Sequence, residues 1–252
     1  MGRATAFLRT LIVVAALAAG ALAPAAAADI TKQTLAISGR DRAYYLYVPD
    51  SAKGADAPVL LLLHGSGGNG LDIASLWKDK ADCEGIVLVA PDAWRNDAWR
   101  PKDDTPHVLG TMINDAATHT GVDFRRLYLF GQSGGAVYAL LLAMIESRAF
   151  AAMAIHAGSW RAPSDFKMIA LATRRMPLKI IIGDQDEYFS LASVRQTEDA
   201  LKKVGFPIAV EIVPGQHHGF NSETAAGTEE SAWAFLKDKA LDAPPVFTDY
   251  GP

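Results

Sequence analysis

Short runs of apolar, often β-branched residues alternate along this chain with longer segments whose apolar positions recur at helical spacing. The short runs have the length and residue preference of buried β-strands. They predict about eight strands, at residues 34–38, 43–48, 59–63, 86–90, 127–130, 151–156, 178–182 and 208–213. The segments between them predict helices, each bounded on at least one side by Gly, Pro or an Asx residue, at residues 71–82, 108–120, 135–146, 191–204 and 229–241.

Strands that alternate with helices indicate an α/β domain. The expected fold is a mostly parallel, doubly wound sheet of about eight strands with helices on both faces. The first two predicted strands have no helix between them, so we expect an antiparallel hairpin at one edge of the sheet.

The N-terminal residues have the composition of a secretory signal peptide. Arg3 and Arg9 provide positive charge without any acid, an apolar run follows over residues 11–22, and Ala26 to Ala28 offer small-residue cleavage sites. A membrane-spanning helix needs about 20 apolar residues, which is more than this run provides. We therefore expect a signal peptide over residues 1–28, no stable membrane anchor after its cleavage, and a secreted or periplasmic location.

The rest of the chain predicts one folded domain over residues 29–243, followed by a proline-containing extended tail over residues 244–252. Apolar residues make up 50% of the 252 residues, which is enough for a substantial core. The 24 basic and 28 acidic residues are spread along the chain without a basic tract, so nucleic acid is not an expected partner. Cys83 is the single cysteine, so no intrachain disulfide can form.

The strongest chemical signal follows the apolar strand at residues 127–130. That strand runs into Gly131-Gln132-Ser133-Gly134-Gly135, and an apolar helix follows. A G-x-S-x-G sequence in this context forms a turn so sharp that larger residues would clash at its glycine positions, and it exposes the serine hydroxyl at the edge of the sheet. Ser133 is therefore the candidate nucleophile.

A glycine-rich turn, His64-Gly65-Ser66-Gly67-Gly68, follows the predicted strand at residues 59–63. Such a turn can direct backbone N–H groups toward a carbonyl oxygen that becomes negatively charged, which forms part of an oxyanion hole. We assign one donor to the Gly134 amide and the other to Ser66, with Gly65 as the alternative. A simple strand-to-helix loop is the competing interpretation. A phosphate-binding loop is disfavoured because no Gly-Lys-Ser/Thr sequence follows.

An acidic turn and a histidine loop follow Ser133 along the chain, each at the end of a predicted strand. The turn contains Asp184, Asp186 and Glu187, and the loop contains His217 and His218. A serine nucleophile needs an imidazole to accept its proton and a carboxylate to fix the tautomer of that imidazole. No H-E-x-x-H sequence or cysteine cluster completes a metal site, so neither a metal nor a cofactor is expected.

With these motifs, the chain resembles the α/β-hydrolase fold family of serine esterases over nearly the whole mature sequence. Residues 44–49, 122–126 and 150–158 are similar to the secreted polyhydroxybutyrate depolymerase and feruloyl esterase group. The resemblance implies a carboxylic ester hydrolase. Its Gly-x-x-Asp pattern, counted from Gly183, implies Asp186 as the acid, and the Pro-Gly-x-x-His-Gly-Phe form of dienelactone-hydrolase-like relatives implies His218 as the base.

In that fold, lids are usually inserted where this chain has residues 158–177, an interval too short for a large cap domain. We therefore expect an open cleft that takes short-chain, aromatic or oligomeric esters. The expected substrate-binding residues are aromatic side chains of the loops at the strand ends: Trp94, Trp99, Trp160, Phe189 and Phe220. For Trp94 and Trp99, a position that covers the core is an equally weighted interpretation.

A serine peptidase of the prolyl-oligopeptidase type and a noncatalytic binding protein are the alternative functions.

Overall fold

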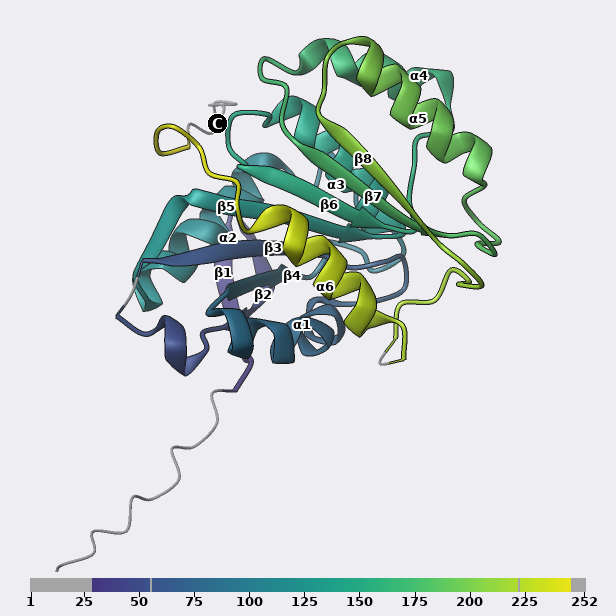
Figure 1. Ribbon diagram of the computed structural model, residues 1–252. Helices are drawn as coiled ribbons and strands as arrows, with labels where there is room; N and C mark the ends of the chain where they lie inside the picture. Colours follow the sequence, from purple (N-terminus) through teal and green to yellow (C-terminus); the bar gives the residue numbers. More distant parts are fainter. Residues whose placement is uncertain (1–28, 55, 222, 246–252) are drawn as a thin grey trace, which may run out of the picture.

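The computed structural model describes residues 29–54, 56–221 and 223–245, so the predicted signal peptide and most of the predicted tail lie outside the described residues. The described residues form an eight-stranded sheet with the strand order β1-β2-β4-β3-β5-β6-β7-β8 (Figure 1). The strands are β1 (Thr31–Ile37), β2 (Arg40–Tyr47), β3 (Ala57–Leu63), β4 (Val87–Pro91), β5 (Val122–Gln132), β6 (Ala152–His156), β7 (Leu178–Gly183) and β8 (Ile208–Val213).

Most neighbouring strands in this sheet run parallel. The exceptions are β1 with β2 and β2 with β4, which pair antiparallel. Ser38 and Gly39 close the β1–β2 hairpin with positive φ angles of 50° and 74°. The expected α/β fold with an edge hairpin is thus confirmed, and the carboxyl ends of β3 to β8 meet at one edge of the sheet.

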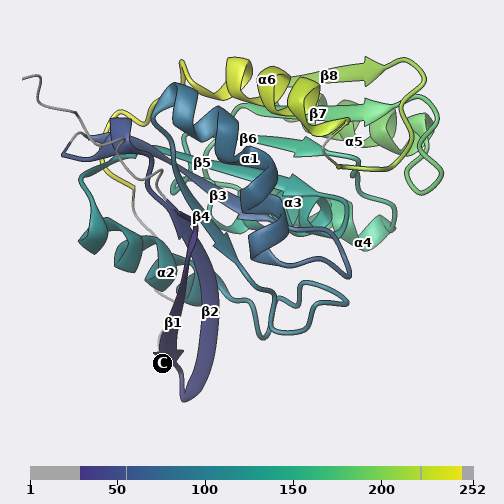
Figure 2. The ribbon, with the colours of Figure 1, turned by 90° about the horizontal axis from the view of Figure 1, so that it is seen from below.

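Helices cover both faces of the sheet, as Figure 2 shows: α1 and α6 lie on one face, and α2 and α3 on the other. Two clusters of buried side chains fill the spaces between sheet and helices, and the strands from β3 to β7 contribute to both clusters. The helices are α1 (Gly70–Glu84), α2 (Pro106–His119), α3 (Gly134–Ile145), α4 (Pro163–Phe166), α5 (Leu191–Lys203) and α6 (Ala225–Leu236), with the 3-10 turns η1 (Asp50–Ala52) and η2 (Lys167–Leu171).

The last helix, α6, begins and ends earlier than the sequence predicts. The predicted range, residues 229–241, extends past the observed end at Leu236. Beyond that end the backbone turns toward β5, where the Leu241 amide donates to the Arg125 carbonyl at 2.8 Å. The Tyr128 hydroxyl also donates to the Lys239 carbonyl at 2.7 Å. These tertiary hydrogen bonds take the place of the last helical turn.

The connection between β6 and β7 contains α4 and η2 and holds no large cap domain, as expected. Neither short element was predicted, because each is too short to show a helical repeat. Among the described helices, none is long and apolar enough to cross a membrane.

Candidate active site

Ser133 lies in the turn between β5 and α3 with φ 54° and ψ −116°, a strained conformation for a residue other than glycine. Its amide donates to the His156 carbonyl at 3.0 Å. The flanking glycines are sterically required, because a Cβ atom at Gly135 would lie 2.1 Å from the Leu63 carbonyl oxygen. A Cβ atom at Gly131 would lie 2.5 Å from the Gly135 oxygen. The sharp turn therefore has the form that the G-x-S-x-G sequence predicts.

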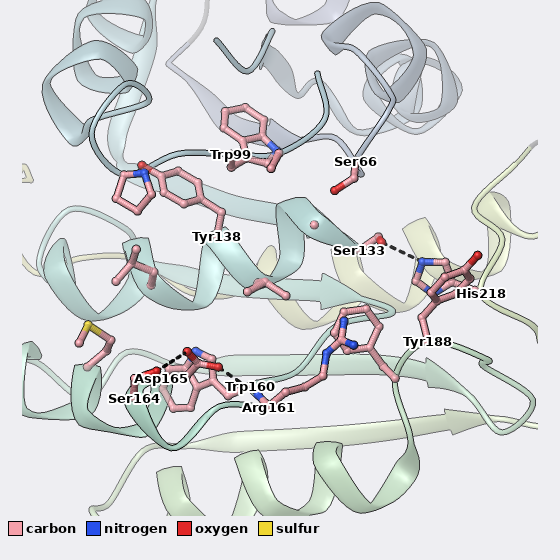
Figure 3. Close-up of a pocket in the computed structure, with 17 residues that line it drawn as sticks. Ser66, Trp99, Ser133, Tyr138, Trp160, Arg161, Ser164, Asp165, Tyr188 and His218 are labelled. Carbon is pink, nitrogen blue, oxygen red and sulfur yellow. Dashed lines mark hydrogen bonds between the residues drawn. The ribbon is translucent and has the colours of Figure 1, made fainter. Parts of the chain in front are cut away.

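A chain of hydrogen bonds joins Ser133, His218 and Asp186. The Ser133 Oγ lies 2.8 Å from His218 Nε2 (Figure 3). On the other side of the imidazole, His218 Nδ1 lies 2.8 Å from Asp186 Oδ2. Because a carboxylate can only accept, Nδ1 carries the proton and Nε2 is free to accept from the serine hydroxyl. This is the tautomer that a general base for Ser133 requires.

Asp186 is held in place by the turn that follows it. Its Oδ1 accepts the backbone N–H groups of Tyr188 and Phe189, both at 2.8 Å. The carboxyl side chain is fully buried and that of His218 is 18% exposed. Tyr188 and Phe189 also pack beside the imidazole, with ring centroids 4.6 Å and 5.8 Å from it. The hydrogen bond to Asp186 and these two ring contacts together fix the orientation of the His218 imidazole.

The other acids and the second histidine lie elsewhere. Asp184 accepts the Gly215 amide at 2.7 Å and so ties the loop after β7 to the loop after β8. Glu187 pairs with Nδ1 of His217 at the surface. The structure therefore brings Asp186 and His218 to Ser133, and it does not bring Asp184 or His217 there.

Ser66 and Gly134, whose amides are the predicted oxyanion-hole donors, line the same cavity as Ser133. A Cβ atom at Gly134 would lie 3.2 Å from the Ser66 nitrogen, so the two residues are in close contact. Within the described part of the chain, neither amide has a hydrogen-bond acceptor. At Gly65, the alternative donor, an added Cβ atom would lie 2.1 Å from Gln132 Oε1. The two residues that the sequence predicts as the donor pair, Ser66 and Gly134, therefore lie next to each other.

His64 shapes this turn. Its Nε2 accepts the Ala93 amide at 3.1 Å, and its Nδ1 lies 2.8 Å from the Gly65 carbonyl, to which it donates. Burial lowers the pKa of His64, which keeps the ring neutral in this bonded form. His64 therefore connects the glycine-rich turn to the loop after β4.

A cavity of about 770 Å³ opens next to Ser133, Ser66 and His218 (Figure 3). The loop after β4 forms one wall, α3 the floor, and the segment from Trp160 to Met168 the opposite wall. The lining residues are mostly apolar or aromatic and are Ser66, Ala98, Trp99, Pro101, Ser133, Gly134, Val137, Tyr138, Leu141, Trp160, Arg161, Ser164, Asp165, Met168, Tyr188, Phe189 and His218.

Three of the five aromatic residues expected at the substrate, Trp99, Trp160 and Phe189, line this cavity. The expectation was wrong for Trp94, which does not line the cavity and is 40% exposed. Its indole ring lies under the Arg40 guanidinium, with Arg40 Cζ 4.7 Å from the ring centroid. It was also wrong for Phe220, which packs on the side chains of β5 and β6 and lines a separate cavity of about 190 Å³.

Among the cavity residues that sequence reasoning missed are Tyr138, Tyr188 and Arg161. Tyr138 stacks on Trp99 with parallel rings 5.5 Å apart. A tyrosine in an otherwise apolar helix was the one available signal for it. The Arg161 guanidinium lies 4.1 Å from the centre of the Phe189 ring and enters the cavity from its far wall (Figure 3).

The sheet order, the strained serine turn and the hydrogen-bonded serine, histidine and aspartate define a protein of the α/β-hydrolase fold. The model of the dienelactone hydrolase family matches residues 43–242, and the chain belongs to that family. It is accordingly a carboxylic ester hydrolase. No curated protein matches the sequence. Among the described residues, no three His, Cys, Asp or Glu side chains converge as a metal site.

Solved structures share this fold at low sequence identity. An S-formylglutathione hydrolase from Agrobacterium tumefaciens is 16% identical with a TM-score of 0.66, over 85% of this chain and 98% of that one. A ferulic acid esterase from Anaeromyces mucronatus, in complex with ferulic acid, is 14% identical with a TM-score of 0.64, over 86% and 92%. A thermostable esterase is 19% identical with a TM-score of 0.65, and this chain, matched over 84%, spans only 63% of it.

Proposed function

We propose that this protein is an exported serine esterase in which Ser133 is the nucleophile, His218 the general base and Asp186 the acid that orients it. The observation that carries the proposal is the pair of 2.8 Å hydrogen bonds that join the three side chains at the mouth of the cavity. This arrangement supports acyl transfer, because a neutral serine is a poor nucleophile without an adjacent base.

In the proposed reaction, His218 removes the Ser133 proton as the hydroxyl oxygen attacks the ester carbonyl. The Ser66 and Gly134 amides stabilise the oxyanion, and the Asp186 carboxylate stabilises the imidazolium. The imidazolium then protonates the departing alcohol, which leaves an acyl group on Ser133. A water molecule, deprotonated by the same histidine, releases the acid and restores the serine.

The proposed substrates are short-chain, aromatic or oligomeric esters. Aromatic rings of Trp99, Tyr138 and Phe189 line the cavity, and the short β6–β7 connection leaves it uncapped. The ferulic acid esterase found on the same fold is consistent with an aromatic acyl group. We expect hydrolysis of p-nitrophenyl esters to slow from acetyl and butyryl to palmitoyl, and faster hydrolysis of the palmitoyl ester would refute this substrate class.

The deciding experiment for the mechanism is labelling with a fluorophosphonate probe, which reacts only with an activated serine. The wild-type protein should be labelled and Ser133→Ala should not, while the variant keeps the wild-type melting temperature. Labelling together with cleavage of peptides but not esters would instead indicate a serine peptidase. An unlabelled, folded wild-type protein would indicate a noncatalytic binding protein.

Export is proposed from the composition of residues 1–28. Expression of the full chain in a Gram-negative bacterium should yield periplasmic or secreted protein shortened at its N-terminus, as mass spectrometry would show. Full-length protein in the cytoplasm would contradict export.

A further inference from the structure

His156 is a fully buried histidine beneath the proposed active site, and it has no part in the mechanism above. It ends β6, the strand next to the one that leads into Ser133. It does not line the substrate cavity, so it cannot touch a substrate bound there. A buried titratable side chain in this position needs a structural or a functional reason.

His156 contacts both of the segments that must meet for catalysis. Its carbonyl oxygen accepts the Ser133 amide at 3.0 Å. Its Nε2 lies 2.9 Å from the side-chain amide of Gln216, and its ring lies 5.3 Å from the ring of Phe220. Gln216 and Phe220 stand two residues before and two residues after His218. The loop that carries His218 therefore contacts the His156 side chain through two residues, Gln216 and Phe220.

The imidazole of His156 is neutral in this environment. Burial lowers its pKa to about 4, and the nearby His218 acts in the same direction while Asp186 opposes it. A neutral ring can bond the Gln216 amide through Nε2 without placing a second positive charge beside His218. Its Nδ1 has no partner among the described residues, so the bond to Gln216 is the one polar contact that orients the ring.

We propose that His156 is a positioning residue that holds the loop at residues 216–220 so that His218 Nε2 stays within hydrogen-bonding distance of Ser133 Oγ. This inference rests on the proposed function of the site. Because proton transfer depends steeply on distance, a displacement of about 1 Å costs on the order of a hundredfold in rate. Substrate affinity should change little, because His218 is the one residue of this loop that lines the cavity.

Three variants test the proposal on p-nitrophenyl butyrate. His156→Leu and Gln216→Leu remove the contact from either side, and His156→Gln keeps a polar atom within reach of Gln216. We expect kcat to fall about tenfold to a hundredfold in both leucine variants, with KM within about twofold of wild type. His156→Gln should restore most of the loss, and the double leucine variant should be no worse than the poorer single one.

His217→Gln is the matched control, because it changes an exposed histidine of the same loop that contacts Glu187 instead. It should leave kcat unchanged. Wild-type kcat in both leucine variants, losses that multiply in the double variant, or a rise in KM alone would overturn the proposal. If His156→Leu does not fold, Gln216→Leu still tests the proposal, because it changes a side chain that is only half-buried. Failure of the proposed function would look different, because the wild-type protein itself would then lack turnover and labelling.

Discussion

Replacing Asp186 by asparagine tests the geometry of the site through a change of one atom and one charge. The Asp186 Oδ1 accepts two backbone amides, and Oδ2 accepts from His218 Nδ1. An asparagine can satisfy the two amides only with its carbonyl oxygen, so its NH₂ group must face the imidazole. Nδ1 then has to accept, and the proton moves to Nε2. His218 in that tautomer would donate toward Ser133 and could not take its proton.

The expected loss in kcat is about 10⁴, the size seen when a serine hydrolase base is held in the wrong tautomer. This corresponds to about 5 kcal/mol of transition-state stabilisation. KM should change little, because Asp186 does not line the cavity. The fold should persist, since the two backbone amides that bond Oδ1 keep an acceptor.

The assay is steady-state hydrolysis of p-nitrophenyl butyrate at pH 7.5, with thermal unfolding of each variant as the check on folding. Asp184→Asn is the matched control, because its carboxylate is exposed and bonds a loop amide instead of the histidine. It should lose less than about threefold. Residual activity above a tenth of wild type in Asp186→Asn, or a larger loss in Asp184→Asn, would refute the assignment of the acid.

Three further predictions concern stability and are measured by urea unfolding. Asp104→Asn should cost about 3–5 kcal/mol, because it removes the negative charge that pairs with the buried Arg42 guanidinium and one of the two oxygens that accept the Trp94 and Arg100 amides; a change below 1 kcal/mol would contradict this. Gly135→Ala should cost about 1–3 kcal/mol, since its methyl group meets the Leu63 carbonyl, and unchanged stability would show that the turn relaxes freely. Burial raises the pKa of Glu229 to about 7, so the folded state binds the extra proton between pH 4.5 and 7 and loses stability as pH rises through that window. Glu229→Gln should therefore be more stable than wild type at pH 8 and equal to it below pH 5, and a constant difference at all pH values would disprove the titration.

The serine turn could be predicted from the sequence because its constraint is local. Gly131 and Gly135 are required by contacts within the turn and with the adjacent strand. The assignment among neighbouring acids and histidines is different, since it depends on how two loops meet. The Gln185 amide bonds the Gln216 carbonyl at 3.0 Å and Asp184 bonds Gly215, and neither pairing has a signature in the sequence.

The prediction failed for Trp94 for a related reason. An aromatic residue in a loop at the edge of the sheet can face the cavity or the surface, and the choice depends on distant partners. Here the indole of Trp94 lies against the guanidinium groups of Arg40 and Arg42 of the edge hairpin, at 4.7 Å and 5.6 Å from its ring centroid. Trp99, five residues later, is instead fixed in the cavity wall by its hydrogen bond to the His64 carbonyl at 2.8 Å.

The walls of the cavity and the hydrogen-bonded side chains come largely from different segments of the chain. Ser133, Asp186 and His218 follow β5, β7 and β8, whereas the two facing walls come from the loop after β4 and the segment from Trp160 to Met168. An engineer could therefore exchange that second segment for one of another length or charge and keep the proton-transfer geometry intact. Such chimaeras would give a family of enzymes with one chemistry and separately chosen substrate preferences.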